Sequence, residues 1–112
     1  MLISYRNKDI QKICENQNFA TRSLQKASAV GKLFLRMNAL ADFETLGDVP
    51  TISPFFRHKL KGKAKDLWAI RIDGANRICF RPVGEYEISS ENEIDLSTVT
   101  SVEINFIGDY HG

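Results

Sequence analysis

Residues 67–81, LWAIRIDGANRICFR, decide the fold because two strand patterns flank a turn signal. In the first half, Ile70 and Ile72 share one face of an alternating pattern, and in the second half Ile78 and Phe80 do the same. The DGAN between the two halves is typical of a β-hairpin turn. This stretch therefore predicts two antiparallel strands, each with one apolar and one polar face.

The length of the loop sets the register of this hairpin. A two-residue loop would place Ile70 opposite Arg77 and mix the two faces. A three-residue loop over 73–75 pairs Ile70 with Ile78 and Arg71 with Arg77, which keeps the faces separate, and we predict this loop. Two arginines opposite each other repel, so an anion or an acidic side chain is expected between them.

The flanking segments supply two helices and two more strands. LISY at 2–5 is a strand candidate, and Asn7 can cap a first helix. Apolar residues recur at steps of three and four in a segment that begins at Ser23, which predicts a second helix. The last strand, SVEINFI at 101–107, is expected to turn Phe106 into the core together with the other alternating apolar residues.

The predicted architecture is α+β, in a single domain over residues 1–112. Two N-terminal helices pack on one face of a mostly antiparallel sheet of about four to five strands, and the other face is open and polar. A long acidic insertion is expected around residues 82–98. Cys14 and Cys79 have neither metal nor disulfide spacing, so both are expected to be reduced. No metal or organic cofactor is implied by the sequence. With no signal peptide and no apolar run of about 18 residues, we expect a cytoplasmic protein without a membrane partner.

Charge is distributed unevenly along the chain, although the net charge is only +1. Residues 57–81 carry eight Lys and Arg against two acids, whereas residues 82–112 carry seven acids and no Lys or Arg. A partner responds to the local field, so the basic block is a candidate surface for phosphate groups. A solvated basic loop is the alternative interpretation.

The open face and its edges gather groups suited to cutting RNA without a metal. In that reaction a base activates a ribose 2′-hydroxyl, an acid protonates the leaving oxygen, and cations stabilise the phosphate. Histidine suits either proton-transfer role. The candidates for catalysis or phosphate contact are His58, Lys61, Arg71, Arg77, Arg81, Asp109, Tyr110 and His111.

These residues also have structural interpretations. Arg71 and Arg77 can instead pair with Glu103 across the sheet, and His58 can be an ordinary surface histidine. A contribution from Lys59, Lys63 and Lys65 would be electrostatic rather than chemical.

Four short blocks carry a resemblance to a known family: FRHKLKG at 56–62, WAI at 68–70, RICF at 77–80 and DYH at 109–111. In this order they resemble the HigB-type branch of the RelE/ParE toxin superfamily, the toxin halves of bacterial toxin–antitoxin modules. The N-terminal strand, the two helices and LADFETLGDVP at 40–50 also fit that layout. The insertion is longer and more acidic than the short turn between the last two strands of the family.

The resemblance implies a ribosome-dependent endoribonuclease that cleaves mRNA in the ribosomal A site. It also implies a cognate antitoxin of the helix-turn-helix, HigA type as partner. Carried over by position, His58 and His111 are the acid–base candidates, with Asp109 and Tyr110 beside them. Lys61 and Arg77 would contact the scissile phosphate. The RNA- or ribosome-binding set is Arg57, Lys59, Lys63, Lys65, Arg71 and Arg81.

The same fold is compatible with two alternative functions. One is a non-enzymatic inhibitor of a DNA topoisomerase, as in ParE-like relatives. The other is a degenerate nucleic-acid- or protein-binding module in a toxin–antitoxin repressor complex, which the acidic insertion favours. The acid–base residues favour the ribonuclease.

Overall fold

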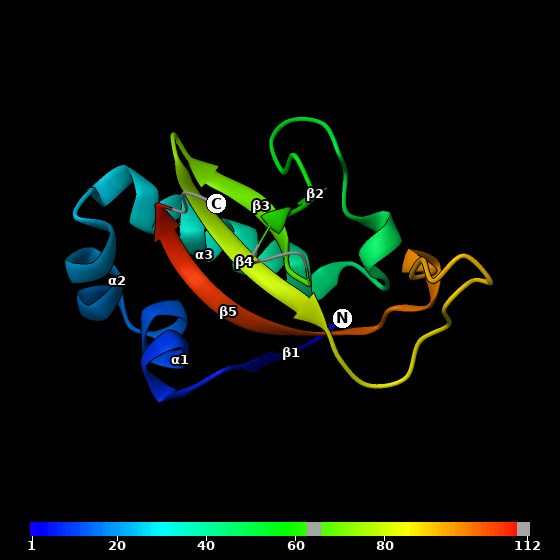
Figure 1. The fold of residues 1–112 in the computed structure, drawn as a ribbon. Coiled ribbons are helices and arrows are strands. Elements are labelled where there is room, and N and C mark those ends of the chain that lie inside the picture. Colours follow the sequence, from blue (N-terminus) through cyan, green and yellow to red (C-terminus); the bar gives the residue numbers. More distant parts are fainter. Residues whose placement is uncertain (63–65, 110–112) are drawn as a thin grey trace.

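A computed structural model describes residues 1–62 and 66–109, and it confirms the α+β fold (Figure 1). Three helices pack against a five-stranded sheet whose strand order is β1-β5-β4-β3-β2. The helices are α1 (Lys8–Glu15), α2 (Gln17–Leu24) and α3 (Ala27–Asp42). The strands are β1 (Leu2–Tyr5), β2 (His58–Lys59), β3 (Trp68–Asp73), β4 (Asn76–Pro82) and β5 (Ser101–Asp109). Only the β1–β5 pair is parallel among these strands, so the mostly antiparallel sheet is confirmed.

Asparagine caps divide the helical region into more segments than the two predicted. Asn7 caps α1 as expected, since its side chain accepts a hydrogen bond from the Ile10 amide at 2.9 Å. Asn16 ends α1 and caps α2, accepting from the amides of Asn18 and Phe19. The short helix α2 was not predicted because it buries only Ala20 and Leu24. Among the described residues, no helix is long and apolar enough to cross a membrane.

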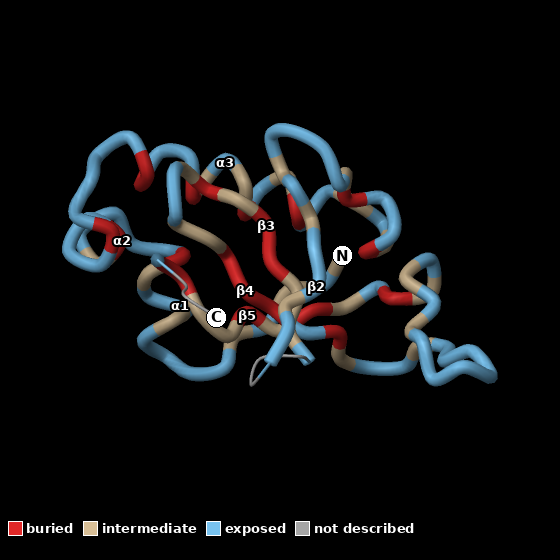
Figure 2. The backbone as a smooth tube through the Cα atoms, turned by 45° about the horizontal axis from the view of Figure 1, so that its top comes forward, coloured by how far each residue is buried: buried red, intermediate tan, exposed pale blue. Residues whose placement is uncertain are grey.

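The core lies between α3 and one face of the sheet, where Figure 2 shows the buried stretches of β3, β4 and β5. The apolar stripe of α3 is buried over its middle, with Leu33 and Leu40 fully inaccessible, whereas Ala27 and Ala41 at its two ends are exposed. Phe80 of β4 is the largest fully buried side chain. The helices therefore cover one face of the sheet and leave the other face without a helix over it.

The β3–β4 hairpin has the predicted register but a different loop. Ile70 pairs with Ile78 and Arg71 with Arg77, which confirms both pairs. Asp73 pairs with Asn76, however, so the loop contains two residues and the extra residue is a bulge between Arg71 and Asp73. The extra residue of the bulge takes the place of the third loop residue, and it keeps the apolar faces of the two strands aligned.

A second bulge, in β5, reverses the predicted orientation of Phe106. Phe80 pairs with Ile104 but Cys79 pairs with Phe106, which leaves Asn105 as the extra residue. Beyond it, Ile107 pairs with Ile78 and joins the core. Phe106 therefore lies on the face away from α3, and the prediction that it enters the core was wrong.

The acidic insertion is folded against the end of the sheet. Ile88 and Ile94 form an isolated antiparallel bridge, and η3 (Leu96–Thr98) follows. The Leu46 amide of η1 (Leu46–Asp48) donates to the Val99 carbonyl, and Val99 is fully buried. In Figure 1 the insertion lies at the end of the molecule opposite α1 and α2, whereas β5 ends beside those helices. The insertion is therefore distant from the C-terminal end of β5.

Asp73 anchors the β3–β4 hairpin to α3 and to Lys26, the N-cap residue of α3. These ion pairs make the stability of the fold depend on pH. Hydrogen bonds from Lys26 and then Lys32, with N–O distances of 3.0 and 3.3 Å, lower the pKa of Asp73 to about 2. Because this pKa lies below the unfolded value of about 3.9, the carboxylate stabilises the fold above that value and loses its contribution as pH falls toward 2.

We expect Asp73→Asn to lower the free energy of unfolding at pH 7, and the difference from wild type to shrink between about pH 4 and pH 2. Urea unfolding at several pH values measures it, with Glu91→Gln on the exposed insertion as control. A difference that is the same at pH 7 and at pH 2 would show that the two lysines do not act through the ionised carboxylate.

Candidate functional site

The sheet face turned away from α3, called the open face, carries most of the predicted site. His58 pairs with Ala69, Ala69 with Cys79 and Cys79 with Phe106, which gives one row across four strands. Ala69 and Cys79 are fully buried although neither belongs to the core cluster, so they form the floor of this face. The side chains that share the face are His58, Ala69, Arg71, Arg77, Cys79, Arg81, Glu103 and Phe106.

His58 is held in one ring orientation at an exposed position. Its Nδ1 lies 2.8 Å from the Phe56 carbonyl oxygen, which can only accept a hydrogen bond. Nδ1 therefore carries the proton in the neutral ring, and Nε2 presents a lone pair. A left-handed backbone at Phe56, with φ of 49°, brings this carbonyl back toward the ring. The arrangement provides a proton acceptor in the neutral state and a donor in the protonated state.

Arg71 and Arg77 are paired in the next row, directly opposite each other. Arg77 Nη1 donates to the carbonyls of Gly74 and Asn76, at 2.7 and 3.1 Å, which fixes the guanidinium at the hairpin turn. The Arg71 guanidinium lies 5.6 Å from the centroid of the Phe56 ring. Strand spacing of about 4.8 Å and a rise of about 3.4 Å per residue place the Cα atoms of His58 and Arg77 roughly 12 Å apart. The two residues therefore share the open face and lie two strands apart.

Arg81 forms an ion pair with Glu103, the acid that the sequence offered as a partner for Arg71 and Arg77. Its Nε donates to Glu103 Oε1 at 3.1 Å, and the two residues are register partners. Asn105 also donates to the same carboxylate. The alternative in which Glu103 pairs with Arg71 or Arg77 was therefore wrong, because the register gives Glu103 to Arg81.

The basic run before β3 is divided between different surfaces. Arg57 turns inward, where it donates to the Leu46 carbonyl at 3.0 Å and lies over the Trp68 ring at 5.6 Å, and burial lowers its pKa. Lys59 pairs with Trp68 and so faces away from the open face. Lys61 is exposed in the loop that follows β2. Lys63 and Lys65 lie outside the described residues, so their predicted role stays a prediction.

The C-terminal part of the predicted site is described only as far as Asp109. This exposed residue pairs with Asn76, one position beyond the row of Arg77 and Gly108. Tyr110 and His111 lie outside the described residues. The backbone of β5 therefore leads the chain to the end of the sheet that holds Arg77.

Cysteine chemistry and metal binding have no support in the described part of the chain. Burial raises the pKa of the Cys79 thiol to about 11, even though Arg77 lowers it slightly, so the reactive thiolate is scarce at neutral pH. Within residues 1–62 and 66–109, no group of three or more His, Cys, Asp or Glu side chains is placed to hold a metal ion.

Sequence reasoning missed two features of this region. Phe56 supplies both the carbonyl that orients His58 and the ring that Arg71 covers, and no pattern in the sequence singles it out. A cavity of about 210 Å³ beside Trp68 is lined partly by Tyr86 and Ile94 of the insertion. Trp68 and the insertion are far apart in the chain, so spacing alone does not bring them together.

Comparison with known proteins supports the fold and no closer relationship. No protein-family model matches the chain, and no curated protein matches its sequence. A solved structure of a YoeB/ParE toxin from Agrobacterium tumefaciens is similar, with a TM-score of 0.53 and 20% sequence identity. The match covers 99% of this chain and 100% of that one. The chain therefore has the fold of that toxin, and at this identity the similarity shows the fold alone.

Proposed function

We propose that this chain is the toxin of a toxin–antitoxin module and acts as a HigB-type, ribosome-dependent endoribonuclease. The observation that carries the proposal is His58, an exposed side chain on the open face whose Nδ1 is bonded to the Phe56 carbonyl. The RelE/ParE-like fold and the four sequence blocks support the same class. The cleaved molecule is mRNA in the ribosomal A site.

The proposed reaction is a metal-free transesterification. A base removes the proton of the ribose 2′-hydroxyl, the oxygen attacks the adjacent phosphorus, and the bond to the 5′-oxygen breaks as an acid protonates that oxygen. His58 and His111 carry these two proton transfers, and Asp109 and Tyr110 assist them. Neutral His58 accepts a proton at Nε2, and protonated His58 donates one from the same atom.

Cationic side chains on the open face stabilise the negative charge that develops on the scissile phosphate. Arg77 uses Nη1 for the turn carbonyls, which leaves its Nε and Nη2 hydrogens for phosphate oxygens. Lys61 joins it from the loop after β2. Arg71 binds the RNA backbone beside them, and ribosome positioning supplies much of the remaining rate enhancement.

The partners follow from the same proposal. They are the translating ribosome with its mRNA, in the cytoplasm, and a cognate antitoxin of the helix-turn-helix, HigA type.

A binding module in a repressor complex is the second candidate, because one observation favours it. Glu93 of the insertion lines a cavity together with Lys59, so an acidic side chain lies beside a predicted RNA-binding lysine. Such a module would bind its partner without cleaving RNA.

Pulse labelling of cells that produce the protein separates these functions. We expect methionine incorporation to fall within minutes while thymidine incorporation continues, because translation is the target. The His58→Ala variant, produced to the same level, should leave both unchanged. An early loss of thymidine incorporation would instead indicate topoisomerase inhibition, and no effect on either would favour the binding module.

A further inference from the structure

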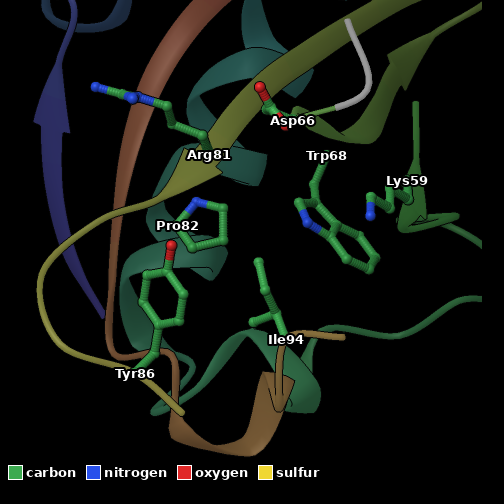
Figure 3. Close-up of a pocket in the computed structure, with 7 residues that line it drawn as sticks. All are labelled: Lys59, Asp66, Trp68, Arg81, Pro82, Tyr86 and Ile94. Atoms are coloured by element: carbon green, nitrogen blue, oxygen red, sulfur yellow. The ribbon is translucent and has the colours of Figure 1, made fainter. Parts of the chain in front are cut away.

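The cavity beside Trp68 joins the end of the sheet to the acidic insertion. Figure 3 shows Trp68 of β3 across the space from Pro82 of β4, with Tyr86 and Ile94 of the insertion at its lower edge. The cavity holds about 210 Å³, and an adjoining cavity of about 290 Å³ shares Lys59, Trp68 and Ile94 with it. The space is therefore large enough for one flat ring with a sugar beside it.

Aromatic rings supply flat walls in this cavity, whose exposed lining is otherwise mostly polar. Trp68 and Tyr86 are only partly buried, and both pack against the core, which restrains their orientation. Arg81 contributes its stem alone, because its guanidinium is bonded to Glu103 and points away from the space in Figure 3. A planar ligand would stack on these walls without displacing an existing ion pair.

Two polar groups of opposite sign remain on the lining. The Asp66 carboxylate accepts hydrogen bonds, and the Lys59 ammonium donates them. Neither forms an ion pair or side-chain hydrogen bond among the described residues. A carboxylate matches the N–H groups on the edge of a base, and a lysine matches a phosphate.

Charge next to Trp68 decides between a nucleotide and a basic side chain. Arg57 already lies over the Trp68 ring and Lys59 lines the same cavity, while Asp66 lines it as well and Glu93 lines the adjoining one. A cationic ligand on this ring would be placed beside two cations, whereas a phosphate would be attracted by them. The lining therefore matches a ligand that has a flat ring with N–H donors for the acids and a phosphate for the cations.

We propose that this cavity binds one unpaired nucleobase of RNA, stacked on Trp68 and Tyr86, with Asp66 at the base edge and Lys59 at the phosphate. The proposal rests on the proposed function for its choice of RNA as the natural ligand. The insertion thereby completes a second RNA contact on the side of the sheet opposite the open face, and it anchors RNA rather than reacting with it.

Tryptophan fluorescence tests this directly, because Trp68 is the only tryptophan in the chain. Titration with guanosine 5′-monophosphate should quench the fluorescence saturably, when excitation is placed at the red edge where nucleotides absorb little. Ribose 5-phosphate should leave it unchanged, since it lacks the base. Saturable quenching by N-acetylarginine amide in place of the nucleotide would assign the cavity to a basic side chain and overturn the proposal.

A matched pair of variants links the signal to the cavity. We expect Tyr86→Ala to weaken nucleotide binding about 5- to 150-fold, the range for loss of one stacking aromatic. Tyr86→Phe keeps the ring and should bind as wild type does. Tyr86→Ala can unfold the insertion, so a substitution at the exposed Asp66 provides a second test. We expect Asp66→Asn to raise the Kd for the nucleotide measurably and to leave the circular dichroism spectrum unchanged.

The experiments distinguish an error in the nucleobase-binding proposal from an error in the endoribonuclease proposal. Nucleotide-dependent quenching by a protein that does not cleave mRNA would reject the endoribonuclease and retain the cavity. If the protein cleaves mRNA but its Trp68 fluorescence does not change on addition of the nucleotide, the nucleobase site is rejected and the endoribonuclease is retained. Equal affinities of wild type, Tyr86→Ala and Asp66→Asn would also reject it.

Discussion

Replacing His58 with alanine should slow mRNA cleavage about 10²- to 10⁴-fold, the usual contribution of a general acid or base. The side chain is exposed, and its one described hydrogen bond ends at the Phe56 carbonyl, so its loss opens no cavity in the core. Single-turnover cleavage on translating ribosomes measures the effect, and thermal unfolding confirms that the variant is folded.

Chemical rescue distinguishes a catalytic His58 from a structural one. Added imidazole can occupy the vacated position at the protein surface and restore proton transfer, so we expect it to recover part of the lost rate. It should not change the rate of wild-type protein. A folded His58→Ala variant that cleaves at the wild-type rate would remove His58 from the mechanism.

Replacing Arg77 with alanine should slow cleavage about 10²- to 10³-fold, the size of effect seen when one donor to a developing negative charge is removed. The two carbonyl bonds of Nη1 hold the guanidinium in place before RNA arrives, so little reorganisation is needed during the reaction. The rate under saturating ribosomes measures this loss, because it separates transition-state stabilisation from binding.

Arg81→Ala is the matched control for Arg77→Ala. Both arginines lie on β4 and on the open face, but Arg81 is engaged by Glu103. We expect the Arg81 variant to keep the saturated rate and to bind ribosomes only slightly more weakly. Equal losses of the saturated rate in both variants would show that the effect is the general charge of the face and not a contact made by Arg77.

The sheet hairpin could be predicted from sequence because local patterns determine it. Alternating apolar residues around DGAN required Ile70 opposite Ile78, and the structure has this pair. The prediction of a three-residue loop was wrong because a bulge in β3 can supply the same odd residue. Binary patterning constrains which faces align, and it does not say where the extra residue is accommodated.

The rest of the site depends on long-range packing that the pattern does not contain. The bulge at Asn105 turned Phe106 to the open face, although the alternation of β5 placed it in the core. Lys59 and His58 are adjacent in sequence but face opposite sides of the sheet, so the basic run is not one surface. The insertion was predicted as a long acidic segment, and only the three-dimensional structure shows that it lines a cavity together with Trp68.

The central claim is tested most directly by mapping cleavage in a purified translation system by primer extension. The comparison is between wild-type protein and a His58→Ala, His111→Ala double variant, on translating ribosomes and on the same mRNA alone. We expect cuts within the A-site codon with wild type only, and only when ribosomes are translating. No cleavage by folded wild-type protein on translating ribosomes would contradict the endoribonuclease.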